Sequence, residues 1–244
     1  MHLIGKDIVW FHTVIWPCML FSANVPLPRT VFCHGFINGP DGKKMSKSIG
    51  NVVEPASMLS KYPVDSFRFF LLREGSFGSD INFVESNLIE RHNSELCDGL
   101  YNLINRTLNL AKTATLSRVP NVEPIAIFDL HEFVTRSAED YARYRLQETL
   151  ERLWLTINCT NKFLNDRAPW KDKDSTSRQV TIRSVLEALY ILAHYLQPIV
   201  PESADRIFAA LHTPKRSIKQ LSWTNLTEGT PLEGTAICSK LNSH

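Results

Sequence analysis

The chain has 244 residues, a length typical of one large domain or two smaller ones. Apolar residues make up 43% of the sequence, enough for a hydrophobic core, and 27 Lys and Arg against 25 Asp and Glu give a net charge of +2. This near-neutral balance argues neither for nor against nucleic acid, so any RNA contact has to come from a local patch of side chains.

The composition excludes a zinc site and a membrane span. The five cysteines are scattered without a Cys-x-x-Cys pair, which predicts reduced thiols and no metal site. No apolar run approaches the roughly 18 residues that a membrane span needs, and the N-terminal residues lack the features of a targeting peptide. We therefore expect a cytoplasmic protein, with the mitochondrial matrix or another organelle as the alternative.

The first 40 residues predict a strand, a helix and a second strand. Residues 2–5 form the first strand, a helix opens near Asp7 with a kink at Pro17, and residues 30–37 form the second strand. This βαβ pattern is typical of a parallel sheet. One such unit cannot cover both faces of a sheet, so we expect the chain to begin inside a domain whose N-terminal half it lacks.

A polar loop follows, and residues 44–48 read Lys-Met-Ser-Lys-Ser between Gly42 and Gly50. Ammonium groups and serine hydroxyls on one mobile loop suit a polyphosphate ligand. Closure of such a loop stabilises the charge that develops on a leaving pyrophosphate. The alternative is a solvated basic surface loop.

The rest of the chain is predicted to be mainly helical. Short helices are expected at residues 55–61 and 65–73, and apolar stripes at helical spacing begin at residue 85. Three or four such helices in sequence form an antiparallel bundle. They are expected over residues 85–112, in a long segment that ends near Arg167, in a segment that ends at Gln197, and in a short segment from Pro201. After residue 214 the sequence is polar and rich in turn residues, so we expect loose order.

Two motifs resemble a known family. Residues 44–48 match the KMSKS signature of class I aminoacyl-tRNA synthetases, and residues 5–17, Gly-Lys-Asp-Ile-Val-Trp-Phe-His-Thr-Val-Ile-Trp-Pro, resemble the strand–helix junction of methionyl-tRNA synthetases. The resemblance covers about residues 1–210. It implies a partial Rossmann-like α/β segment over residues 1–80 and an all-α anticodon-binding bundle over residues 81–214, mostly α overall, with a loosely ordered tail over residues 215–244.

The resemblance also implies a ligase that uses ATP with Mg²⁺ to activate methionine and transfers it to tRNA-Met. The family's first nucleotide signature, His-x-Gly-His, does not occur in this sequence, and neither does its zinc-bearing insertion. We therefore expect the isolated chain to be inactive or nearly so, because positioning by the first half of the fold is lost.

The family pattern assigns roles to individual residues near the N-terminus. Asp7 would contact the ribose, and His34 and Gly35 the adenine. Asp7 can instead be a helix cap, and Trp16 can be a core aromatic residue. Lys44 and Lys47 would be the catalytic, triphosphate-holding residues with Ser46 and Ser48 in support, and His12, Ile15 and Trp16 would line the methionine pocket.

The helical half would bind the CAU anticodon. Asn102 and Arg106 project from one helix face, where they would read base edges, and Trp170 would stack on a base. The alternatives are a solvated helix face for Asn102 and Arg106 and a core position for Trp170. We expect such a core position for Trp154. The role of Asp98 on the same face is open, since it can repel a phosphate or orient Arg106, and Asp65 and Arg68 are expected to be cap and surface residues.

Two other hypotheses remain at this point. One is a non-catalytic tRNA-binding module that has kept the fold, which the absent first signature favours. The other is a different class I synthetase, such as a leucyl, isoleucyl, valyl or cysteinyl enzyme.

Overall fold

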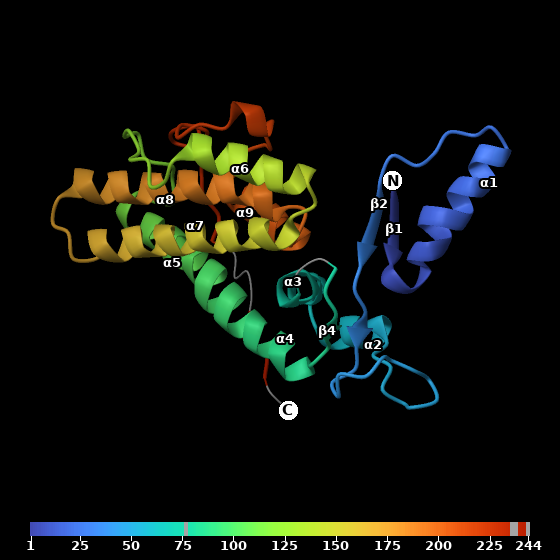
Figure 1. The fold of residues 1–244 in the computed structure, drawn as a ribbon. Helices are drawn as coiled ribbons and strands as arrows, with labels where there is room; N and C mark the ends of the chain where they lie inside the picture. Colours follow the sequence, from blue (N-terminus) through green and yellow to red (C-terminus); the bar gives the residue numbers. More distant parts are fainter. Residues whose placement is uncertain (76–77, 235–238, 243–244) are drawn as a thin grey trace.

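The structure is a computed structural model that describes residues 1–75, 78–234 and 239–242. It has an α/β part at its N-terminal end and a bundle of helices formed by the rest of the chain, as predicted (Figure 1). The first strands and helix α1 (Trp16–Ser22) project away from the bundle, while helices α3 (Val64–Glu74) and α4 (Glu85–Arg91) lie between the two parts (Figure 1). None of the described helices is both long and apolar enough to cross a membrane.

The predicted βαβ unit is present. Strand β1 (His2–Gly5) pairs in parallel with β2 (Val31–His34), and Gly5 lies opposite His34. A short 3-10 helix, the π-helix η2 (Phe11–Ile15) and α1 connect the strands. Pro17 lies in the first turn of α1, so the predicted kink is a change from π-helix to α-helix. Because the two strands are parallel, their carboxyl ends meet at the same edge of the sheet.

The second predicted strand is interrupted after His34. A Cβ atom on Gly35 would lie 2.0 Å from the carbonyl oxygen of Ser79, so the two backbones approach more closely than a side chain allows. Beyond this point the chain joins a different sheet, in which β3 (Ile37–Asn38) pairs in parallel with β4 (Ile81–Asn82). The single strand predicted over residues 30–37 is therefore two strands in two sheets.

The helices expected in the middle of the chain are present as α2 (Pro55–Lys61), α3 and one long helical run. That run consists of α4, the π-helix η3 (His92–Tyr101) and α5 (Asn102–Ala114). Its apolar stripe faces the bundle, which follows from the helical spacing of its residues. Four of the five predicted members of the stripe are completely buried: Leu96, Leu100, Leu103 and Thr107.

The bundle is completed by α6 (Leu130–Ala142), α7 (Leu146–Arg167), α8 (Ser175–Leu196) and α9 (Pro201–Ala210). Helix α8 is the central one, since nearly all of its second half is buried. Helix α6 was not predicted, although the sequence carries a signal for its first turn. The side chain of Asp129 accepts a hydrogen bond from the backbone N–H of Glu132 at 2.9 Å, which is half of an N-terminal capping box.

Residues 215–234 are more ordered than their composition predicts. The buried carboxylate of Glu187 on α8 accepts hydrogen bonds from the backbone N–H groups of Asn225 (2.9 Å) and Leu226 (3.0 Å). Arg183 pairs with Glu187 at 2.9 Å and donates to the carbonyl oxygen of Leu226 at 2.6 Å. The expectation of loose order for residues 235–238 and 243–244 falls outside the described residues.

Helix α3 joins the α/β part to the bundle. The ring of Phe69 stacks on Trp154, with ring centroids 4.5 Å apart, and Trp154 is 6% exposed, which confirms its predicted core position. Arg68 is exposed as predicted, but its guanidinium donates to the carbonyl oxygens of Pro198 (2.7 Å) and Ile199 (3.1 Å) after the end of α8. Asp65 caps α9 rather than its own helix.

Candidate functional site

The Lys-Ser loop folds back toward the carboxyl ends of β1 and β2. The ammonium of Lys44 lies 3.9 Å from the carboxylate of Asp7, which follows the end of β1, and both side chains are about half exposed or more. His34 ends β2 directly opposite Gly5. The structure thus brings Asp7, His34, Gly35 and Lys44 to one edge of the sheet, where open parallel sheets bind ligands.

Asp7 is not a helix cap. The 3-10 helix that follows β1 begins after Gly5, and no side chain accepts a hydrogen bond from its first turn. The Asp7 carboxylate is left to face Lys44, at a distance where attraction between two exposed charges is modest. Both groups are therefore available to a ligand.

The ring of Phe36 contacts the ammonium group of Lys44, and this contact was not predicted from the sequence. The ammonium groups of Lys6 and Lys44 each lie 4.6 Å from the centroid of the Phe36 ring. Lys6 also pairs with Asp80 at 2.6 Å, and the backbone N–H of Phe36 donates to Asp80. The hydrogen bond from Lys6, together with that from Phe36, lowers the pKa of Asp80 below its ordinary value. Residues before and after the loop therefore fix one edge of the site.

The loop itself is a series of turns. Gly42 and Gly50 have φ angles of +73° and +75°, a conformation that favours glycine at both ends of the motif. The hydroxyls of Ser46 and Ser48 are 2.8 Å apart, and the backbone N–H of Ser46 donates to the side chain of Asn51 at 2.9 Å. Lys47 is exposed. The motif thus presents ammonium and hydroxyl groups on a surface that solvent reaches.

The predicted methionine-pocket residues lie along one helical stretch but are not enclosed. His12 contacts the carbonyl oxygen of Ile8 through Nδ1 at 3.0 Å and meets the ring of His2 edge to face. Ile15 is 37% exposed and Trp16 is 41% exposed, so Trp16 is not a core aromatic residue. An apolar pocket needs walls that residues 1–30 do not supply by themselves.

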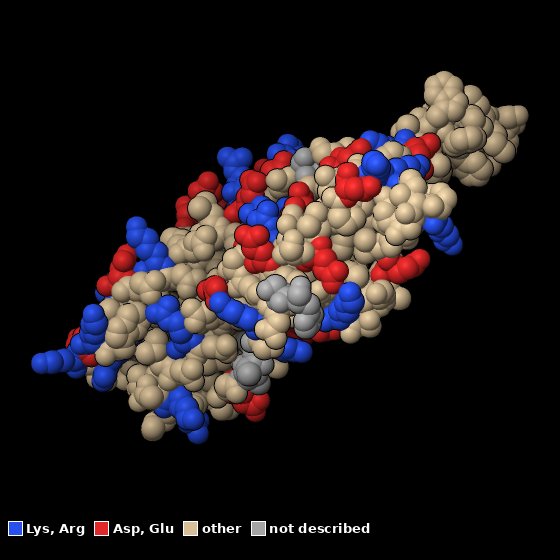
Figure 2. Space-filling view, turned by 90° about the horizontal axis from the view of Figure 1, so that it is seen from below, with Lys and Arg blue, Asp and Glu red and all other residues tan. Residues whose placement is uncertain are grey.

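The same stretch carries an unusually apolar surface. Residues 8–28 contain no Lys, Arg, Asp or Glu, and the end of the molecule that they form is an uncharged knob in Figure 2. Trp10 (63%), Phe11 (57%) and Phe21 (69%) are largely exposed there. Exposed aromatic residues that share one surface in this way are typical of a site that binds another molecule.

At the opposite end of the bundle, two of the predicted RNA-binding residues are in contact. The guanidinium of Arg106 on α5 lies 5.2 Å from the ring of Trp170, which follows α7. It also donates to the side-chain oxygen of Asn165 on α7 at 2.8 Å. Asn102 is exposed one turn before Arg106. Asn165 was missed in the sequence, although Asn158, Asn161 and Asn165 form a polar stripe along α7.

The end of α7 explains why Trp170 is on the surface. Ala168 adopts a left-handed conformation (φ +41°) that stops the helix, and Pro169 is buried, so the chain turns outward at the next residue. Trp170 is 48% exposed, unlike the core residue Trp154. The core alternative for Trp170 is therefore wrong.

Asp98 does not orient Arg106. Its carboxylate pairs with Lys240 at 2.8 Å, and this contact raises the pKa of Lys240. Asn93 holds the same C-terminal segment through two hydrogen bonds to the backbone of Leu241. The negative charge of Asp98 is thus offset locally, and Asn165 is the residue that orients Arg106.

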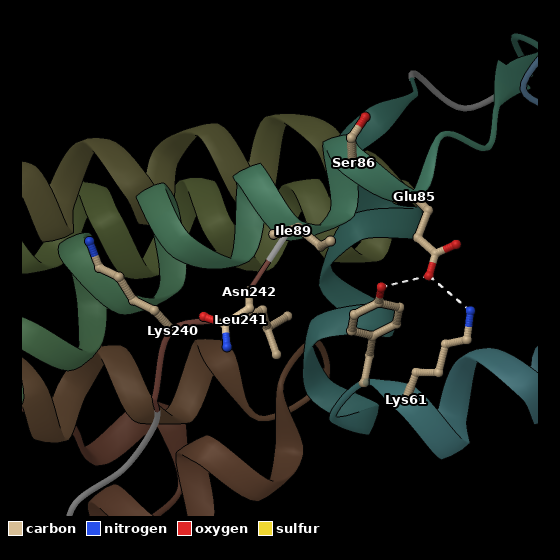
Figure 3. A pocket seen from close by; sticks show the side chains of 8 residues that line it. Lys61, Glu85, Ser86, Ile89, Lys240, Leu241 and Asn242 are labelled. Carbon is tan, nitrogen blue, oxygen red and sulfur yellow. Dashed lines mark hydrogen bonds and ion pairs between the residues drawn. The ribbon is translucent and has the colours of Figure 1, made fainter. Parts of the chain in front are cut away.

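The turn between α7 and α8 carries two lysines and two aspartates, at residues 171–174. Figure 2 shows more Lys and Arg than Asp and Glu at this end of the bundle. A separate hollow of about 670 Å³ lies between α2, α4 and residues 240–242, where Lys61 points toward Glu85 (Figure 3). Burial and a hydrogen bond to Glu85 raise the pKa of Tyr62 there to about 12. None of the predicted site residues lines this hollow.

Two family models of known proteins match this chain, one over the N-terminal α/β part and the other over the helical bundle. Residues 1–108 match the family model "tRNA synthetases class I (M)", and residues 121–237 match "Anticodon binding domain of methionyl tRNA ligase". The chain belongs to the methionyl-tRNA synthetase family. It is 39% identical over 238 residues to the methionine–tRNA ligase of Fusobacterium nucleatum, a match that covers 93% of this chain and 37% of the relative. It is 34% identical to that of Bacillus subtilis, covering 97% and 37%.

Solved structures of the family share the fold. Mycobacterium tuberculosis methionyl-tRNA synthetase in complex with methionyl-adenylate superposes with a TM-score of 0.80 at 34% identity, covering 95% of this chain and 48% of that one. The apo form of the same enzyme gives a TM-score of 0.83 at 30% identity, covering 100% and 50%. The chain thus spans half or less of the length of the family members that it matches.

Proposed function

We propose that this chain supplies the phosphate-handling loop and the anticodon-binding helices of a methionine–tRNA ligase. The reaction would convert methionine and ATP to methionyl-adenylate and pyrophosphate, and the methionyl group would then pass to tRNA-Met. The observation that carries the proposal is the Arg106–Trp170 pair, in which a guanidinium on α5 meets an exposed indole in the turn after α7. A stacking surface beside a guanidinium is what recognition of an unpaired anticodon base requires.

The loop would act on the triphosphate. Lys44 and Lys47 are point charges that can follow phosphate oxygens as the loop closes, and the two serine hydroxyls can donate to the same oxygens. ATP would arrive with Mg²⁺, which offsets part of its charge. Asp7 would hold the ribose, and Gly35 would leave room for the adenine beside β2. Charge on the departing pyrophosphate is the quantity that these groups stabilise.

Methionine activation would need a second stretch of polypeptide. The exposure of Ile15, Trp16 and the aromatic residues around them supports an arrangement in which the first half of the catalytic fold covers this surface. Without that half, the methionine and the α-phosphate are not positioned against each other.

The test is methionine-dependent ATP–pyrophosphate exchange. The 244-residue chain alone should show none above background, whereas a chimera with the N-terminal half of a family member joined before residue 1 should be active. In the chimera, Lys47→Ala should lower kcat by about 100-fold or more, and Lys173→Ala, a control outside the loop, should leave it unchanged. Robust exchange by the chain alone, or a chimera that is indifferent to Lys47→Ala, would contradict the proposal.

A further inference from the structure

Two lysines contact the ring of Phe36, one from the junction after β1 and one from the Lys-Ser loop. The ammonium groups of Lys6 and Lys44 each lie 4.6 Å from the centroid of this ring. The side chain of Phe36 is half-buried, and it packs against neither of the hydrophobic clusters that the described residues form. Core packing therefore does not account for an aromatic residue here, whereas the two cations do.

The two ammonium groups differ in their other contacts. Lys6 is fixed by the carboxylate of Asp80, which lies 2.6 Å away and also accepts the backbone N–H of Phe36. Among the described residues, Lys44 has only the carboxylate of Asp7 near its ammonium, and their 3.9 Å separation is too long for a hydrogen bond. An ammonium group carries three donors. The donors of Lys44 are thus open to a ligand, while Lys6 is engaged by the protein.

The backbone of Lys44 is held as well. Lys44 pairs with Asn38 in an antiparallel bridge, and the side-chain amide of Asn51 donates to the carbonyl oxygen of Lys44 at 3.5 Å. Lys47 is exposed and has no ion pair or ring contact with the residues that the structure describes. The first lysine of the motif is therefore oriented through both its backbone and its ammonium group, and the second is not.

We propose that Phe36 is a positioning residue that presents the Lys44 ammonium to the triphosphate of ATP. The inference rests on the proposed phosphate-handling role of the loop and adds to it a residue outside the lysine motif. The ring takes up one side of the ammonium, so phosphate oxygens can approach from the other sides. A side chain that is ordered beforehand loses less conformational freedom when the ligand binds. At an exposed site such a contact changes an equilibrium constant by about two- to fivefold.

The experiment uses the chain itself with inorganic tripolyphosphate as the probe. Calorimetry measures the affinity, and NMR follows the ε-protons of Lys44, which the ring current of Phe36 should shift. Phe36→Leu should remove this shift and weaken binding about two- to fivefold, whereas Phe36→Tyr keeps the ring and should retain both. Phe163→Leu is the matched control, because it removes a ring that lies 5.5 Å from the guanidinium of Arg167 on α7, and it should bind like the wild type.

A double-mutant cycle with Lys44→Ala shows whether the ring acts through the lysine. In the Lys44→Ala background, Phe36→Leu should have no further effect on affinity. Three results would overturn the inference: no loss of affinity in Phe36→Leu, an equal loss in Phe36→Tyr, or a loss that persists undiminished in the Lys44→Ala background.

The single variants separate this failure from that of the proposed function. If Lys44→Ala weakens binding and Phe36→Leu does not, the ring does not position the lysine, but the role of the loop stands. If the wild type does not bind tripolyphosphate, or if neither Lys44→Ala nor Lys47→Ala weakens binding, the proposed role of the loop is wrong as well.

Discussion

The carboxylate of Asp65 on α3 accepts hydrogen bonds from both the backbone N–H (2.7 Å) and the hydroxyl of Ser203 in the first turn of α9. The same hydroxyl lies 2.7 Å from that of Tyr101, the residue before Asn102. All three side chains are buried. A continuous chain of hydrogen bonds therefore joins α3 to α9 and to the end of η3, directly before the helix α5 that carries Asn102 and Arg106.

Asp65→Ala should lower the free energy of unfolding by about 2–3 kcal/mol, because it removes an N-terminal cap and leaves buried donors unpaired. Urea denaturation measures this change. Asp205→Ala is the control: Asp205 is also on α9, but it is exposed and pairs with Lys215 at the surface, where about 1 kcal/mol or less is at stake. Equal effects of the two substitutions would contradict the role of Asp65 as a buried clamp.

Glu187→Ala should lower the free energy of unfolding by about 3–5 kcal/mol, because it leaves the buried guanidinium of Arg183 without its carboxylate partner. The backbone amides of Asn225 and Leu226 should also exchange with solvent much faster, since Glu187 accepts both of them. Hydrogen exchange with mass spectrometry detects this change. Unaltered protection of residues 222–226 would show that the segment does not depend on Glu187.

Stability should fall as the pH is lowered from 7 toward 5.5. Burial lowers the pKa of His92 and of His194 below the ordinary value of 6.5. Below that pH the unfolded chain takes up protons at these residues that the folded chain does not, so unfolding is favoured, with a limit of about 1.4 kcal/mol per pH unit for each histidine. The stability present above pH 6.5 is lost as the pH falls toward the folded pKa values.

His92→Gln should flatten this dependence, and His131→Gln, at an exposed position on α6, should not. Urea denaturation at several pH values makes the comparison. A wild-type profile that is flat between pH 7 and 5.5 would contradict the lowered pKa values. His92 contacts Ser66 of α3 at 2.7 Å, so the buried ring lies where α3 meets the π-helix η3.

Asn165→Ala should weaken binding of a CAU stem-loop about fivefold, or roughly 1 kcal/mol, which is the net contribution of a typical hydrogen bond. The reason is that Arg106 loses the acceptor that holds its guanidinium over Trp170. Asn165→Asp keeps an acceptor and should retain more affinity than Asn165→Ala. Asn121→Ala, in the loop before α6, is the control. If all three variants bind like the wild type, Arg106 does not need to be oriented.

Local signals in the sequence predicted most helices and the βαβ unit. The apolar stripe of Leu96 to Thr107 follows from spacing alone, and the helix over residues 55–61 has the predicted bounds. Helix α6 was missed although Leu130, Phe133, Val134 and Tyr141 have helical spacing and Asp129 and Glu132 form a recognisable first turn.

The features that sequence did not reveal depend on contacts between distant segments. The break after β2 results from the backbone of Ser79 beside Gly35, 44 residues later in the chain. The order of residues 222–226 comes from the buried Glu187, which lies on a helix whose spacing predicts only an apolar core. The contact of Arg106 with Asn165 cannot be read from spacing either, because tertiary packing decides it.

The central claim is that the helical face around Arg106 and Trp170 reads the methionine anticodon. The most direct measurement is the affinity of the chain for a stem-loop with CAU compared with the same stem-loop carrying the three bases in scrambled order, at one fixed salt concentration. The account predicts at least about tenfold tighter binding of CAU, with the preference lost in Trp170→Ala. Equal affinity for both RNAs, or a preference that survives Trp170→Ala, would contradict it.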